Sequence, residues 1–318
     1  MRNAATGGAS RTQRVHSSAK SAKPGKKSSN KFDPGCSLRL YNAPCFPFVW
    51  ARGDRTLSKN SFLLTKWYLD CVAENGDAAI LYVADLRWNA LSLHYGSLIT
   101  VIDGKVGSGS SLRGSTGPKF DKKIIVVNQP GLDVAGTWEG LRAPVRRTVF
   151  QNEQGSVDWH CLQPMSQADL LVRGKKIGGL GYAECLTLSL PPWQLPLISL
   201  HWGRYLSLED AVVWIDWQGP VQHQTVIHNG EEHHASSITE SEIVLDDAIA
   251  RLELDCGLVL RQGYLGDTVF PGLSRLAGLL PRSMLLVNEC KWLSSGVFHT
   301  APRESSGWAI HEVVKWSE

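Results

Sequence analysis

No apolar run in the sequence is long enough to cross a membrane. A membrane-spanning helix needs about 20 consecutive, mostly apolar residues, and a secretion signal needs a shorter apolar segment near the start. Neither pattern occurs. The seven cysteines are scattered and odd in number, without a C-x-x-C pair, which argues against a disulfide-rich scaffold and against a zinc ribbon. We therefore expect a cytoplasmic protein without a membrane-spanning segment.

Acidic residues are missing from residues 1–32, which hold eight lysines and arginines. The remaining 25 basic and 30 acidic residues give the rest of the chain a net charge of −5, whereas the whole chain carries +3. Because this segment is rich in Ser, Gly, Ala and Lys and has few large apolar groups, we predict a disordered basic tail. Two alternatives stay open: transient contact with an anionic membrane surface or nucleic acid, and an organelle transit peptide. We predict no specific nucleic-acid partner.

Three common site motifs are also missing. No G-x-S-x-G elbow is present, so nothing indicates acyl hydrolysis. Residues 107–114 (GSGSSLRG) are rich in glycine, but they lack the Lys-Ser/Thr pair of a phosphate-binding loop. His233 and His234 follow two glutamates in a polar stretch, with no third element to complete a metal site. We therefore expect no metal centre.

Long helical patterns are scarce, and short strand-like runs replace them. Residues 62–72 (FLLTKWYLDCV) and 78–85 are examples, and the ENGD sequence at 74–77 is typical of a hairpin turn. Only residues 273–280, which lie between two prolines, predict a short helix. Strand-like runs at roughly 8–12-residue spacing predict an all-β fold, with two tandem antiparallel barrels or sandwiches.

A glycine-rich segment at residues 178–219 lies where the two predicted β units join. Glu184 interrupts a strand-like run, and the prolines that follow (PPW, LP) have no N–H to donate to a ladder. We therefore predict two domains, at residues 33–190 and 191–318. The segments WYLDCVAENGDAAILYV and RYLSLEDAVVWIDW share a strand, acidic turn and strand pattern, which alone does not establish a repeat.

Several ionisable and aromatic residues near this joint lie on strands that are predicted to be buried. A carboxyl group among Trp and Tyr rings has a raised pKa, because desolvation disfavours its charged form. Such an acid can protonate an alkene or epoxide, or hold the polar end of an apolar ligand, and indole faces can stabilise a carbocation. Alternatively, the acids point outward or form structural ion pairs with Arg204 and Lys315. The catalytic candidates are Glu184, Tyr182 and Asp216, and the substrate-binding candidates are Trp159, His160, His201, Trp202, Arg204 and Trp214.

Four loosely spaced motifs occur in order along the chain. They are W-x-x-D (residues 67–70), G-x-G-Y-x-acid (179–184), HWGR (201–204) and G-W-x-x-x-E (307–312). In these motifs the chain resembles the carotenoid 1,2-hydratase (hydroxyneurosporene synthase) and AttH-like proteins, over about residues 35–318. The resemblance implies two tandem lipocalin-like (calycin-type) β-barrels. It also implies acid–base addition of water to an isolated isoprenoid double bond, without a cofactor, and relatives include pericyclases and cyclases.

The same resemblance implies roles for individual residues. The acid after the glycine and tyrosine is Glu184, with Tyr182 beside it and Trp159 on the preceding hairpin strand. The chain departs from the family pattern at two positions. The family has Asp where this chain has Glu184, and it has His two residues before the tryptophan, where this chain has Val157, although His160 follows.

Two functions from different classes follow from this reading. The first is a cofactor-independent hydratase, isomerase or cyclase for an isoprenoid-type apolar substrate. In it Glu184 is the general acid, Tyr182 is its hydrogen-bond partner, and the histidine, arginine and aspartate candidates orient the acid or a water molecule. The second is a carrier for a lipid, pigment or other hydrophobic small molecule, which the same residues would bind without turnover. A purely structural β protein is a third reading, and it predicts no cavity of ligand size.

Overall fold

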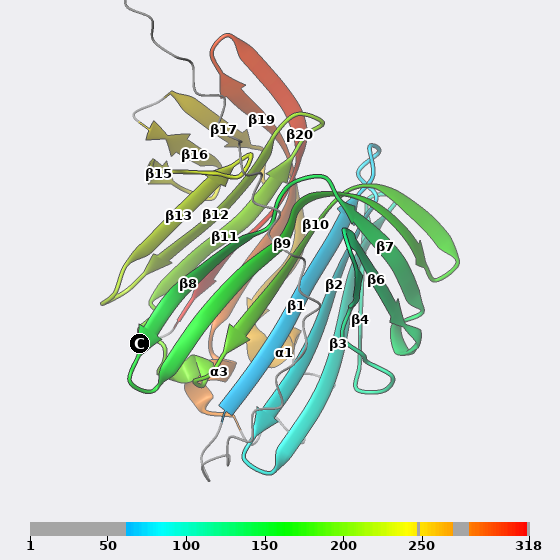
Figure 1. Ribbon diagram of the computed structural model, residues 1–318, viewed down its shortest axis with the longest axis vertical. Coiled ribbons are helices and arrows are strands. Elements are labelled where there is room, and N and C mark those ends of the chain that lie inside the picture. Colours follow the sequence, from blue (N-terminus) through cyan, green and yellow to red (C-terminus); the bar gives the residue numbers. More distant parts are fainter. Residues whose placement is uncertain (1–61, 247–248, 270–279, 317–318) are drawn as a thin grey trace, which may run out of the picture. The chain divides into compact units, whose positions relative to one another are not determined.

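The computed structural model describes residues 62–246, 249–269 and 280–316. The predicted basic tail and nearly all of the helix predicted at residues 273–280 lie outside these ranges. The described chain is almost entirely β-structure, in two antiparallel sheets of ten strands each (Figure 1). The all-β, two-sheet prediction is therefore confirmed, while the domain boundary at residue 190 stays a prediction. Within these ranges no helix is long and apolar enough to span a membrane.

The first sheet, blue to green in Figure 1, has the order β4-β3-β2-β1-β10-β9-β7-β6-β5, with β8 paired to β9. Its strands are β1 Phe62–Val72, β2 Ala78–Trp88, β3 Leu91–Ile102, β4 Lys105–Ser111, β5 Lys119–Asp121, β6 Ile124–Gln129, β7 Val134–Gly140, β8 Val145–Asn152, β9 Gly155–Val172 and β10 Lys175–Leu188. A short 3-10 helix, Pro130–Leu132, joins β6 to β7.

The second sheet has the order β14-β13-β12-β11-β20-β19-β17-β16-β15, with β18 paired to β19. Its strands are β11 Ser199–Leu206, β12 Ala211–Gln218, β13 His223–His228, β14 Glu231–His233, β15 Ala235–Ile238, β16 Glu242–Leu245, β17 Ala250–Leu254, β18 Leu258–Tyr264, β19 Asn288–Thr300 and β20 Arg303–Lys315. The short helices are the 3-10 turn Pro192–Gln194 between the sheets, α1 Leu265–Thr268 and α3 Arg282–Leu285.

The two sheets repeat one strand order, so each strand of the first has a counterpart ten strands later. Two glycines align the counterparts residue by residue. Gly179 on β10 leaves room for the carbonyl oxygen of Val72, and Gly307 on β20 does the same for Leu206. The similar sequences that precede and follow the acidic turns lie on β1–β2 and β11–β12, and they occupy corresponding places in the two sheets.

This alignment pairs residues that occupy equivalent positions in the two sheets. Counted back from Val72 and Leu206, which face the two glycines, Tyr68 corresponds to Trp202 and Asp70 to Arg204, and the strand registers agree. Glu184 on β10, opposite Tyr68, corresponds to Glu312 on β20, opposite Trp202. Two carboxylates thus occupy equivalent positions in the two halves of the described chain.

Each sheet buries one face in a core of its own and shares a third core with the other sheet. Alternation along a strand separates these faces, because successive side chains point to opposite sides. On β1, Trp67 and Leu69 join the first sheet's own core, whereas Tyr68 joins the shared core. On β12, Trp214 joins the second sheet's own core. The shared core therefore includes alternate residues of β1, β9, β10, β11 and β12.

Side chains at equivalent positions of the two sheets also contact each other. The Arg204 guanidinium donates to both oxygens of Asp70, at 3.0 and 2.8 Å, and both side chains are fully buried. Arg204 also donates to the carbonyl oxygen of Trp308 at 2.7 Å. The rings of Tyr68 and Trp202 meet edge to face with centroids 4.9 Å apart. These contacts fix the sheets to one another beside the shared core.

We predict that alanine is poorly tolerated at Gly179 and Gly307. A Cβ atom at these positions would lie 2.1 Å from the Val72 oxygen and 2.2 Å from the Leu206 oxygen, and paired backbone cannot easily move away. Each change should lower the free energy of unfolding in urea by about 1–3 kcal/mol. Gly178→Ala is the matched control, because its Cβ approaches only the rotatable Asp169 side chain, at 3.1 Å. Equal losses in all three variants would contradict the steric argument.

Candidate functional site

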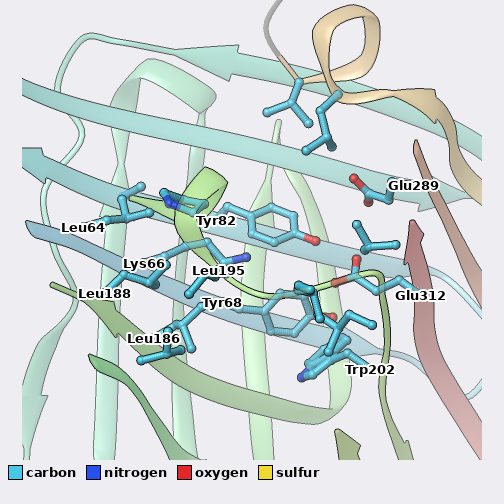
Figure 2. A pocket seen from close by; sticks show the side chains of 18 of the residues that line it. Leu64, Lys66, Tyr68, Tyr82, Leu186, Leu188, Leu195, Trp202, Glu289 and Glu312 are labelled. Atoms are coloured by element: carbon cyan, nitrogen blue, oxygen red, sulfur yellow. The ribbon is translucent and has the colours of Figure 1, made fainter. Parts of the chain in front are cut away.

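A cavity of about 320 Å³ lies between the two sheets, against the shared core. Figure 2 shows Glu289 and Glu312 entering it from one side and Leu64, Leu186 and Leu188 lying at the other. Its walls are mainly apolar and aromatic. A second cavity of about 220 Å³ adjoins it, because residues such as Leu64 line both, and its walls are almost wholly apolar. Together they offer a space of ligand size with few polar groups.

Glu184 places a carboxyl group in the wall formed by the first sheet. It is 6% exposed, lines the cavity and accepts every one of its hydrogen bonds through a single oxygen, Oε2. The donors are Trp159 Nε1 at 2.5 Å, the Tyr182 hydroxyl at 2.7 Å and Trp202 Nε1 at 3.3 Å. Three donors on Oε2 leave that oxygen as an acceptor only, so a proton bound to this carboxyl group belongs on Oε1.

Burial raises the pKa of Glu184 above its ordinary value of 4.5. The hydrogen bonds from Trp159 and Tyr182 act in the opposite direction, because they stabilise the charged form. Burial is the stronger influence, so the neutral acid is favoured over a wider pH range than for an exposed glutamate. Burial also raises the pKa of the Tyr182 hydroxyl, which therefore remains a donor.

Glu312 has a very different partner, although its position is equivalent. Lys291 on β19, opposite Glu312 in the register, donates to its Oε2. Burial would raise the pKa of Glu312, but the charge and hydrogen bond of Lys291 lower it, so this carboxyl group is ionised. The Lys291 ammonium is buried, and its Nζ lies 5.3 Å from the Trp202 ring centroid and 5.9 Å from that of Tyr68.

Glu289 adds a third carboxyl group, two residues before Lys291 and on the same face of β19. It is 5% exposed, and its Oε1 is buried without a hydrogen-bond partner among the described residues. Arg261 Nη1 lies 3.5 Å from Oε2, and Lys291 Nζ lies 4.0 Å from Oε1. Burial and the nearby charge of Glu312 raise the pKa of Glu289. Burial thus favours the neutral form of two of these carboxyl groups, while Lys291 favours the ionised form of the third.

The structure brings together four of the nine residues predicted for the site. Trp159 and Trp202 line the cavity with Glu184, and Tyr182 lies behind them as a hydrogen-bond donor. The resemblance implied this grouping of Glu184, Tyr182 and Trp159. Trp202, from the other sheet, completes it.

The other five predicted residues lie elsewhere, which corrects the expected convergence of these groups. Arg204 faces the shared core, but Asp70 holds it in an ion pair, so it does not contact Glu184. The remaining four point to the opposite face of their strands, because each immediately precedes or follows a residue that faces the shared core. They are His160, His201, Trp214 and Asp216.

On that opposite face, most of these four side chains have contacts of their own. Trp214 packs in the second sheet's own core, and Asp216 accepts a hydrogen bond from Gln218 Nε2 at 2.7 Å. His201 Nδ1 is buried with no hydrogen-bond partner in the described ranges, and burial lowers the pKa of its ring. Burial also lowers the pKa of His160, beside Arg146.

The sequence prediction missed three charged residues at or beside the cavity. Lys291 and Glu289 lie in a strand-like run near residue 290, and Lys66 lies in the run at 62–72. A charge inside an apolar strand is the same signal that singled out Glu184, and it also marked Glu312 as an ionisable residue on a buried segment. Applied to every strand, it would have found Lys66, Glu289 and Lys291.

Comparison with known proteins finds similarity in solved structures alone. No protein-family model matches the sequence, and no curated protein matches it either. The structure of CghA with Sch210972 is similar over 80% of this chain and 89% of that chain, with a TM-score of 0.50 and 11% identity. Kievitone hydratase from Nectria haematococca matches over 80% and 89%, with a TM-score of 0.49 and 10% identity. An AttH-like protein from Nitrosomonas europaea matches over 79% and 92%, with a TM-score of 0.47 and 9% identity.

At such low identity the likeness to CghA shows a shared fold and no more. It agrees with the fold that the resemblance implied, over the residues that the structure describes. Membership of the carotenoid 1,2-hydratase family and an isoprenoid substrate stay predictions, since no sequence match supports either.

Glu184 should contribute a loss of stability as the pH rises. Above its ordinary pKa of 4.5, the folded protein keeps a proton that the unfolded chain releases. The contribution of this group to the free energy of unfolding therefore decreases with rising pH, until the raised folded-state pKa is passed. Glu184→Gln cannot ionise, so its decrease over that window should be smaller, although Glu289 still contributes in the same direction. If the free energies of unfolding in urea change with pH in the same way for the two proteins, the assignment is contradicted.

Proposed function

We propose that this protein is an acid–base enzyme that protonates an unsaturated apolar small molecule in the cavity between its sheets. The observation that carries this proposal is Glu184. Its buried carboxyl group is held through one oxygen by two indoles and a tyrosine, while the other oxygen makes no hydrogen bond within the described chain. An isoprenoid-type alkene or epoxide is the proposed substrate class, and water addition is the proposed reaction.

The chemical step balances without any reactant other than water. The Glu184 O–H bond breaks as a C–H bond forms at one alkene carbon, which leaves a carbocation at the other and a carboxylate on Glu184. A water oxygen then bonds to the cation and loses a proton, which gives an alcohol. Loss of a proton from the cation instead gives isomerisation, and attack by a second double bond gives cyclisation.

The surroundings of Glu184 suit such a step. Trp159 lines the cavity, and the face of its indole can stabilise a positive charge that develops beside it. The hydrogen bonds to Oε2 stabilise the carboxylate after it has lost its proton, so the neutral acid and its conjugate base are both accommodated. Because its pKa is raised, Glu184 keeps its proton up to a higher pH than an exposed glutamate does, as a general acid requires.

A non-catalytic carrier is the second candidate, and the adjoining 220 Å³ cavity favours it. That cavity has almost no polar surface and leads away from Glu184, past Trp88 and Trp193. Such a cavity suits the binding of a hydrocarbon chain. In this reading Glu184 binds the polar end of the ligand without changing it.

The deciding experiment follows atoms from the solvent into the ligand. The purified protein is incubated with acyclic isoprenoid alkenes and alcohols of increasing length, in heavy-oxygen water and separately in deuterium oxide, and the recovered molecules are analysed by mass spectrometry. An enzyme should transfer heavy oxygen, or deuterium on carbon, to at least one of them. If a molecule binds to the protein but gains no label from the solvent, the result would support the carrier and overturn the enzyme.

A further inference from the structure

The repeated strand order places a second glutamate where the first sheet has its acid. Glu184 is opposite Tyr68 on β1, and Glu312 is opposite Trp202 on β11, at the same distance in sequence from the aligning glycines. Both carboxyl groups line the one cavity, from different sheets. The two halves thus contribute the same chemical group to one site.

The two aromatic residues opposite these glutamates join them in space. Trp202 neighbours Glu312 in the strand register and donates its indole N–H to Glu184, at 3.3 Å. Tyr68 neighbours Glu184 in the register, and its ring packs against that of Trp202. Figure 2 shows Tyr68, Trp202 and Glu312 grouped in the cavity wall. Glu184 and Glu312 are therefore on either side of one aromatic pair.

The hydrogen-bond partners of the two glutamates nevertheless differ in charge. Glu184 is held by neutral donors, Trp159, Tyr182 and Trp202. Glu312 is held by a buried cation, Lys291, which stands opposite it on β19. Pairs of carboxyl groups whose environments favour opposite protonation states are the arrangement that divides acid from base in many enzymes.

We propose that Glu312 is the general base of this site and takes the proton from the water molecule that adds to the substrate. The inference rests on the proposed function of Glu184. As the water oxygen bonds to the carbocation, one of its O–H bonds breaks and the proton passes to Glu312. When the product leaves, that proton returns through water to the carboxylate of Glu184, which resets both groups.

Two further features support this role. The Tyr68 hydroxyl is buried, lines the cavity and has no hydrogen-bond partner in the part of the chain that the structure describes. An unpartnered hydroxyl group in the cavity wall can hold the water molecule that awaits addition. Glu289 is less readily ionised than Glu312, because burial and the charge of Glu312 raise its pKa.

The experiment uses the full chain, with the substrate found by the labelled-water screen. In Glu312→Gln, water addition should fall about a hundredfold. Deuterium exchange into the recovered substrate should persist, because Glu184 still protonates the alkene and takes a proton back. Glu304→Gln, on the same strand but exposed and paired with His299 at 3.0 Å, is the matched control and should react like the wild type.

A second variant guards against loss of folding, because Glu312→Gln leaves Lys291 buried without its anion. The double variant Glu312→Gln, Lys291→Met removes both charges and keeps the size of both side chains. It should unfold at a temperature near that of the wild type and show the same loss of water addition with persisting exchange. Lys291→Met alone should also lose water addition, since Glu312 without its cation takes up a proton.

The outcomes separate this proposal from the one on which it rests. Wild-type water addition in the folded double variant would overturn the role of Glu312 while leaving Glu184 as the acid. Loss of exchange together with addition in that variant would also overturn it, because Glu312 would then be needed for protonation. If Glu184→Gln keeps both exchange and addition, the proposed acid itself is wrong.

Discussion

Replacing Glu184 with glutamine is expected to lower turnover about a thousandfold while ligand binding persists. Glutamine has the size of glutamate, and its amide oxygen can still accept from Trp159, Tyr182 and Trp202. Its amide nitrogen then occupies the place of Oε1, where no acidic proton remains. The change thus removes the proton donor and keeps the wall of the cavity. Turnover is measured as label gained from water, and binding as the fluorescence of anilinonaphthalene sulfonate in the cavity.

Asp158→Asn provides the control for the same chemical change on a neighbouring strand. Asp158 precedes Trp159 on β9 and points to the other face, where it accepts from the hydroxyl groups of Thr148 and Ser156 at 2.7 and 2.8 Å. It should react at the wild-type rate. Turnover of Glu184→Gln within about twofold of the wild type would remove Glu184 from the mechanism, and equal losses in both variants would indicate a structural cause.

Breaking the Asp70–Arg204 pair should produce the largest loss of stability in the described chain. Both side chains have no exposed surface, so Asp70→Asn leaves a buried guanidinium without a counter-charge. Removal of one partner of such a pair costs about 3–5 kcal/mol, because the remaining charge cannot be solvated. We expect this loss in the free energy of unfolding in urea. The exposed pair of Arg147 and Glu232 is the comparison, and Arg147→Ala should cost less than about 1 kcal/mol.

The double variant Asp70→Leu, Arg204→Met tests the explanation rather than the size of the loss. With both charges removed, most of the stability should return, since buried ion pairs are often replaced by apolar residues at little cost. A double variant as unstable as Asp70→Asn would show that the geometry of the pair, and not the unpaired charge, holds the sheets together.

The strands were predictable from sequence because local patterns determine them. Alternating apolar residues and short turns such as the ENGD at 74–77 are properties of neighbouring residues, and they predicted the all-β fold. Glu184 was predictable for a similar reason, since a carboxyl group inside a strand-like run is visible in one segment alone.

The rest of the site depends on residues far apart in the chain. Asp70 and Arg204 are separated by 134 positions, and no local pattern tells that they meet. Alternation did imply that His201 and Trp202 cannot both face one cavity, but the choice between them requires the register of β11 against β20. The pairing of Lys291 with Glu312 likewise follows from the register of β19 and β20.

The strand arrangement affects how the protein assembles during synthesis, because the ribosome makes the chain from its N-terminus. In each sheet the first strand pairs with the last, β1 with β10 and β11 with β20, so the middle of a sheet is the part synthesised at the two ends of its segment. Such long-range pairing forms late. Both glutamates lie on these closing strands. A nascent chain that lacks β20 therefore already contains Glu184, but it cannot yet enclose a ligand.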